Sequence, residues 1–175
     1  MPYTIRPAEQ WWNDLAAVFE RAFAAAGVLS PQARLIAKEV RHVYADPEYW
    51  RLYDDTLPVL TQLSGEGWTH LLLSNHVPEL PALLHSLQID GCFAQVFNSA
   101  ETGYEKPHPQ AFQNVLHASG NTETVWMIGD NPIADIAGAA AAGIPGILVH
   151  KRHAEARYQC DSLTQVPTML RANSA

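Results

Sequence analysis

The stretch TVWMIGDNPIADIAGAAAAGIPGILV, residues 124–149, decides the fold of this chain. Its first five residues form an apolar run that is typical of a buried strand. A Gly-Asp turn at residues 129–130 then leads into an Ala-rich segment that predicts a helix from about residue 133. A glycine and a proline end this helix, and residues 146–149 predict the next strand. A strand, a helix and a second strand at this length make a βαβ unit, which implies a parallel sheet.

Length and composition narrow the class of protein. The chain has 175 residues, 47% of them hydrophobic, which is enough for one domain with a core and a small appendage. Its net charge is −7 and it has no basic run, so a nucleic-acid partner is disfavoured. It has no apolar run of membrane-spanning length, and its first residues lack the apolar core of a secretory signal. Cys92 and Cys160 match no metal-ligand spacing, which favours a reduced, cytoplasmic protein.

The first 50 residues are purely helical in pattern and look like a separate appendage. Apolar residues recur at three- and four-residue spacing over residues 8–27, and Ser30-Pro31 opens a second helix that ends at Asp46-Pro47. The Trp11-Trp12 pair could stack on a ligand, but at this spacing core packing is the favoured interpretation.

Strand and helix patterns alternate through the second half of the chain. Strands are predicted at residues 70–73 and 93–97, and helices at 78–87 and 110–118. After residue 149 a basic loop leads into a tail with a few apolar contacts. We therefore expect an α/β fold with a doubly wound parallel sheet.

Polar residues fall where these strands end. Ser74 follows the strand at 70–73, Lys106 lies in a Gly- and Pro-rich loop, and Asp130 and Asp135 follow the strand at 124–128. Because ligands bind beyond the carboxyl ends of the strands in open α/β sheets, we expect these side chains to converge. A hydroxyl and an ammonium suit phosphate oxygens, and a carboxylate pair suits Mg²⁺. Each residue alone has an ordinary structural explanation, such as a helix-start carboxylate, but together they favour a phosphoryl-transfer site.

Three motifs in this order resemble those of the haloacid dehalogenase superfamily. They are LLLSN ending at Asn75, GYEKPHPQAF around Lys106, and GDNPIAD followed by its Ala-rich helix. The resemblance runs from about residue 11 to residue 170, and it implies a Rossmann-like core with a magnesium-dependent phosphoric-ester hydrolase activity on a small phosphorylated molecule. It makes residues 1–53 the latter part of a helical cap and residues 54–175 the core.

The resemblance also implies a role for each site residue. Ser74 and Asn75 would contact the transferring phosphoryl group, and Lys106 would orient that group against the nucleophile. Asp130 would bind Mg²⁺ directly, with Asp135 in support. A 2-haloacid dehalogenase is the disfavoured variant, because those enzymes work without metal and do not keep this carboxylate pair.

The first motif of the superfamily, a strand that ends in Asp-x-Asp and supplies the nucleophile, has no counterpart in this sequence. Asp54-Asp55 is the nearest match, but its neighbours do not make a buried strand and it lacks the intervening residue. We expect the missing strand to lie upstream of Met1, and the chain alone to show little or no turnover. The alternative is a non-catalytic binding or assembly module derived from such a hydrolase.

The same absence predicts a gap in the sheet. By resemblance the missing strand is central, between the strand at 124–128 and the strand at 70–73. Its loss leaves two unpaired backbone edges, which is costly. Direct pairing of the two flanking strands, insertion of Tyr3-Thr4-Ile5, or a partner chain could fill the gap, and we expect a homo-oligomer.

Overall fold

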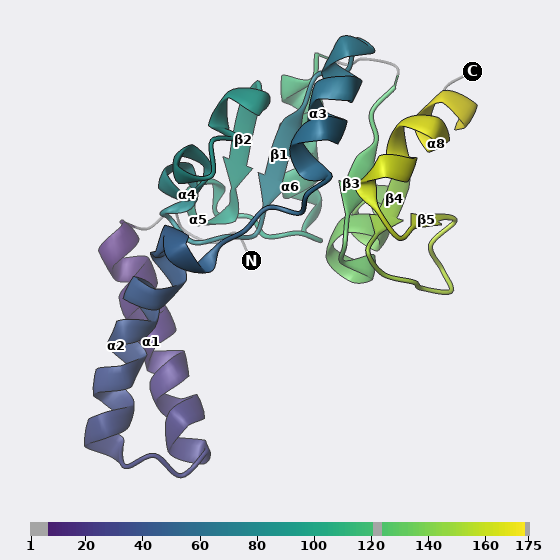
Figure 1. Ribbon diagram of the computed structural model, residues 1–175. Helices are drawn as coiled ribbons and strands as arrows, with labels where there is room; N and C mark the ends of the chain where they lie inside the picture. Colours follow the sequence, from purple (N-terminus) through teal and green to yellow (C-terminus); the bar gives the residue numbers. More distant parts are fainter. Residues whose placement is uncertain (1–6, 121–123, 174–175) are drawn as a thin grey trace.

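The computed structural model describes residues 7–120 and 124–173, and it shows an α/β core from which a helical hairpin projects (Figure 1). The helices are α1 (Ala8–Ala25), α2 (Ser30–Ala45), α3 (Thr56–Gly65), α4 (Leu80–Ser86), α5 (Ser99–Thr102), α6 (Pro109–Ala118), α7 (Gly138–Ala141) and α8 (Val166–Asn173). Short helical turns cover Pro47–Tyr49, Asp90–Cys92 and Leu163–Gln165, and a π-helix, Pro132–Ala137, runs directly into α7. The strands are β1 (Leu71–Ser74), β2 (Gln95–Asn98), β3 (Met127–Gly129), β4 (Gly146–Val149) and β5 (Tyr158–Cys160).

The strands form two separate parallel sheets. One contains β1 and β2, with Leu72 opposite Val96, and the other has the order β3-β4-β5, with Ile128 opposite Ile147. Within the described residues β1 and β3 each have a partner on one side only, and their other edges carry no strand (Figure 1). The parallel α/β fold is confirmed, but direct pairing of β1 with β3 is wrong. The segment Tyr3-Thr4-Ile5 lies outside the described residues.

Apolar clusters bury opposite faces of these sheets. Val59 and Leu63 of α3 pack with β4 and α8, and this cluster includes the fully buried Ile147. Phe112 of α6 packs in a second cluster that contains both Leu73 of β1 and Met127 of β3. The helix α6 therefore covers the region where the two sheets face each other.

The hairpin of α1 and α2 is joined to the core by a polar network. Trp12 is 6% exposed, and its indole N–H donates to both carboxylate oxygens of Glu79 at 3.0 Å. Arg41 of α2 donates to Glu79 at 3.0 Å and to Glu9 of α1 at 2.5 Å. These carboxylates raise the pKa of Arg41, with the hydrogen bond to Glu9 as the largest cause. The burial of Trp12 agrees with the prediction that the tryptophan pair packs in the core.

Two elements differ from the sequence prediction. Residues 158–160 form β5, an edge strand that pairs with β4, where the sequence predicted only a tail. The helix after β3 begins as a π-helix at Pro132 instead of as a regular α-helix. No helix in the described part of the chain has the length and apolar character to cross a membrane.

Candidate active site

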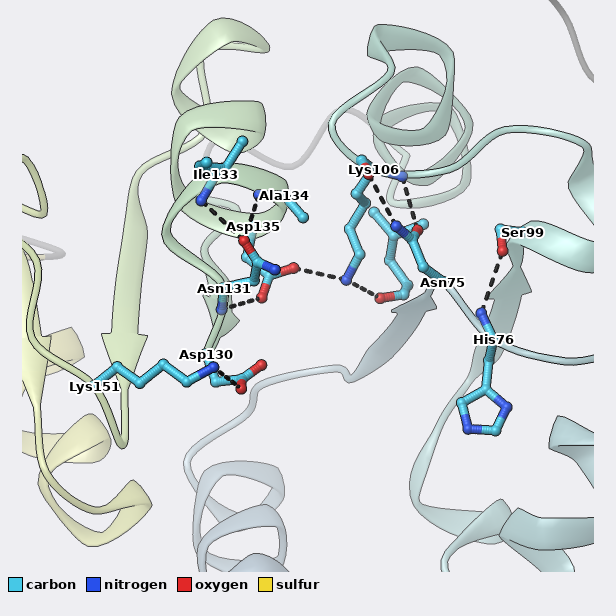
Figure 2. Close-up of polar contacts among 11 residues, drawn as sticks. Asn75, His76, Ser99, Lys106, Asp130, Asn131, Ile133, Ala134, Asp135 and Lys151 are labelled. Atoms are coloured by element: carbon cyan, nitrogen blue, oxygen red, sulfur yellow. Dashed lines mark hydrogen bonds and ion pairs between the residues drawn. The ribbon is translucent and has the colours of Figure 1, made fainter. Parts of the chain in front are cut away.

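A buried ion pair lies at the carboxyl ends of β1 and β3. The Lys106 ammonium contacts the Asp135 carboxylate at 2.8 Å, with side chains only 10% and 6% exposed. The same ammonium donates to the backbone carbonyl of Leu73 in β1 at 2.7 Å (Figure 2). An ammonium has three N–H donors, so one remains for a ligand. Lys106 and Asp135 are therefore brought together as the sequence predicted.

The position of Asp135 depends on the turn after β3. Its second carboxylate oxygen accepts the backbone N–H of Asn131 at 2.9 Å. A Cβ atom on Gly129 would lie 2.2 Å from that oxygen, so only glycine leaves room for the carboxylate. The Asn131 side chain accepts the N–H groups of Ile133 and Ala134, and thus caps the helix (Figure 2). An asparagine followed by proline is a helix-start signal, so this role was open to prediction from the sequence.

Asn75 holds the loop that carries Lys106. Its side-chain oxygen accepts the Lys106 N–H at 2.7 Å, and its side-chain NH₂ group donates to the Lys106 carbonyl at 2.9 Å. Both ends of this amide are therefore occupied by the backbone of Lys106 (Figure 2). In this arrangement the amide positions the lysine instead of facing a ligand.

Asp130 forms a separate, exposed ion pair. Its carboxylate contacts the Lys151 ammonium at 2.8 Å, and the two side chains are 59% and 54% exposed. The hydrogen bond to Asp130 is the largest cause of a raised pKa at Lys151. Lys151 follows β4, the neighbour of β3, so strand order places it beside Asp130, although the sequence analysis did not include it. Figure 2 shows the two pairs side by side at the edge of the sheets.

Ser74 and His76 complete the carboxyl end of β1. Ser74 is the last residue of the strand, and its hydroxyl makes no hydrogen bond to any residue in the described ranges. The backbone N–H of His76 donates to the Ser99 hydroxyl at 3.2 Å, while its ring packs against the rings of Tyr44 and Trp50, which also contact each other. Burial is the largest cause of a lowered pKa at His76.

The donor set for a cation is small. Among residues 7–120 and 124–173, no group of three or more His, Cys, Asp or Glu side chains could hold a metal ion. Both oxygens of Asp135 are already engaged, whereas Asp130 is exposed with a surface lysine as its partner. Because Mg²⁺ is often held by one or two carboxylates together with water and substrate phosphate, the residues fit a magnesium ion bound through Asp130.

The fold and the site together define a class of protein. It is a parallel α/β protein with a buried Lys106–Asp135 pair at the strand ends, with Ser74 as the last residue of β1 and with Asp130 directly after β3. This set of groups suits the binding of a phosphoryl group.

Comparison with known proteins identifies the family. The model of the haloacid dehalogenase-like hydrolases matches residues 5–143, and the chain belongs to this family. It is 30% identical over 154 residues to the Rhythmically expressed gene 2 protein of Drosophila melanogaster, covering 82% of this chain and 58% of that protein. It is 32% identical over 136 residues to the phosphoserine phosphatase of Thermus thermophilus, covering 77% of this chain and 53% of that enzyme.

Solved structures share the fold at low sequence identity. The chain matches a HAD phosphatase from Thermococcus onnurineus with a TM-score of 0.70 and 18% identity, covering 93% of this chain and 89% of that one. It matches an L-2-haloacid dehalogenase from Xanthobacter autotrophicus with a TM-score of 0.71 and 17% identity, covering 93% and 76%. The chain spans little more than half the length of the curated relatives above.

Proposed function

We propose that this chain carries the phosphoryl-binding part of a magnesium-dependent phosphoric-ester hydrolase that acts on a small phosphorylated molecule. The observation that supports this most directly is the buried Lys106–Asp135 pair, whose ammonium also binds the carbonyl of Leu73, the residue before Ser74. A phosphatase among the relatives agrees with this class of reaction.

Each side chain has a definite task in the proposed site. The third donor of the Lys106 ammonium and the Ser74 hydroxyl bind the phosphate oxygens. Asn75 fixes the loop that presents the ammonium, and Asp135 keeps the ammonium at the strand ends. Asp130 holds Mg²⁺, which when bound neutralises charge on the phosphoryl group.

A covalent step needs a nucleophile, and the sequence has no Asp-x-Asp motif to supply one. We therefore propose that this chain alone shows little or no turnover. A reduced, cytoplasmic setting is part of the proposal, because Cys92 and Cys160 are both free thiols.

Calorimetric titration with phosphate, with and without Mg²⁺, tests the binding part of this proposal. Ser74→Ala should weaken phosphate binding by about fivefold, the loss of one hydrogen bond. Ser86→Ala is the matched control, because this exposed serine ends α4 away from the site. Phosphate binding that is equal in both variants would contradict the role of Ser74.

An activity assay tests the incomplete-site part. Hydrolysis of a generic aryl phosphate with Mg²⁺ should stay at background. Robust turnover that Asp130→Asn abolishes would mean that another carboxylate serves as nucleophile, and the proposal of an incomplete site would be wrong.

A second candidate is a non-catalytic assembly module, and the open edges of β1 and β3 favour it. All four residues of β1 and all three of β3 are only partly buried, whereas Ile147 and Leu148 of β4 are fully buried. We propose that a strand from a second copy of the chain covers these edges. Size-exclusion chromatography with light scattering tests this pairing, and a clean monomer at micromolar concentration would rule it out. Failure to bind either Mg²⁺ or phosphate would favour the assembly module over the hydrolase.

A further inference from the structure

A cavity of about 190 Å³ lies between the helical hairpin and the turn that follows β1. Four aromatic side chains of α1 and α2 line it, namely Trp11, Trp12, Phe19 and Tyr44. A cavity of about 150 Å³ can hold a benzene molecule, so this one has room for a compact group of similar size. The hairpin thus contributes an aromatic wall beside the candidate active site.

The remaining lining combines three aliphatic side chains, Leu15, Val40 and Val77, with the polar Asn75 and His76 and one carboxylate, Glu105. Glu105 lines the cavity from the core side, and this exposed carboxylate has no hydrogen bond or ion pair with the part of the chain that the structure describes. No lysine or arginine among the described residues lines the cavity. The nearby Arg41 is bound to two carboxylates and lies over the Trp12 ring, 6.0 Å from its centroid, so the other three aromatic rings are the ones open to a ligand. His76 also lines the cavity, and burial lowers its pKa, which keeps its ring neutral at pH 7.

We propose that this cavity binds a small alkylammonium group, such as a trimethylammonium head. The faces of tryptophan, tyrosine and phenylalanine rings attract cations, and aromatic cages recognise quaternary ammonium ligands in this way. The Glu105 carboxylate adds a direct charge attraction. A neutral aromatic group would fit the volume but would gain nothing from the charge of the Glu105 carboxylate.

The cavity adjoins the candidate active site. Asn75 lines it and also holds the loop of Lys106, and Glu105 immediately precedes that lysine. This step rests on the proposed function, and together with it the cavity makes the substrate class a phosphoric ester of an amino alcohol. Its phosphate would bind at Lys106 and Ser74, and its ammonium group would enter the cavity.

Binding of choline to the full chain, without any phosphate, tests the cavity by itself. Tryptophan fluorescence and calorimetry at constant ionic strength would compare choline with its neutral isostere 3,3-dimethylbutan-1-ol. We expect choline to bind at least about fivefold tighter than the isostere, because this is the gain in affinity that a partly desolvated cation–π contact provides. Glu105→Gln should reduce that preference, whereas Glu101→Gln, an exposed glutamate of α5 that does not line the cavity, should leave it unchanged.

Two outcomes of the comparison between choline and its isostere would overturn the proposal. Equal binding of choline and the isostere would make the cavity an apolar site, and absence of binding by both would exclude a ligand of this size. Trp11→Leu should also lose choline binding, with its melting temperature showing that it remains folded. Phosphate binding without choline binding would overturn the cavity alone, and choline binding without phosphate binding would overturn the proposed function alone.

Discussion

Removing the charge of Lys106 should destabilise the protein strongly. Lys106→Met deletes the contacts to Asp135 and to the Leu73 carbonyl and leaves the Asp135 carboxylate, 6% exposed, without a cation. Breaking a buried ion pair from one side costs about 3–5 kcal/mol, because the remaining charge is uncompensated. At about 2–4 °C per kcal/mol for a chain of this size, the melting temperature should fall by about 6–20 °C.

Urea unfolding followed by circular dichroism measures this loss, and two further variants identify its cause. Lys106→Met/Asp135→Asn should recover at least about 1 kcal/mol of the free energy of unfolding, since the orphaned charge is gone. Lys151→Met breaks an exposed pair with Asp130 and should change the free energy by no more than about 1 kcal/mol. Two results would refute the argument that burial sets the loss of stability. One is a double variant that is no more stable than Lys106→Met. The other is an equal loss in the free energy of unfolding for Lys106→Met and Lys151→Met.

Two further predictions concern the turn after β3 and the histidine beside the cavity. Gly129→Ala places a methyl group 2.2 Å from the Asp135 carboxylate. It should lower the free energy of unfolding in urea by about 1–3 kcal/mol and weaken phosphate binding. Gly65→Ala is the control, because no atom lies within 4 Å of the new methyl group, and it should not destabilise the protein. Because burial lowers the folded-state pKa of His76 below its ordinary value of 6.5, the unfolded chain binds more protons, and the free energy of unfolding should fall as the pH drops below 6.5. Unfolding curves of His76→Gln should show a shallower decline over that range, and an identical decline would contradict the role of burial.

The sequence predicted the parts of the site that depend on strand ends. Lys106 contacts both Asp135 and the Leu73 carbonyl, next to Ser74 in the chain, because the carboxyl ends of parallel strands share an edge, and local patterns were enough to locate those ends. The direction of the Asp130 side chain could not be predicted in this way. It depends on Lys151, which lies 21 residues further along the chain. No local pattern tells that Asp130 pairs with Lys151 and Asp135 with Lys106.

Other features depend on contacts that no local pattern records. Residues 158–160 form too short a segment to show alternation, and they become a strand only because β4 offers its edge. The gap between the two sheets was predicted from the family resemblance alone, because a pattern of apolar residues cannot express the absence of a pairing. Trp11 and Trp12 belong to a set of apolar residues that recurs at helical spacing, which predicts an apolar face but not that this face closes a cavity with Glu105.

The contacts of Lys106 have a mechanical consequence. Its ammonium binds the Leu73 carbonyl in one sheet and Asp135 at the end of the other, while Phe112 packs against residues of both. No strand ladder joins the sheets within the described residues, so this polar bridge and that apolar contact transmit force between them. A ligand that draws the ammonium away from either partner therefore also alters how firmly the two halves of the molecule are coupled.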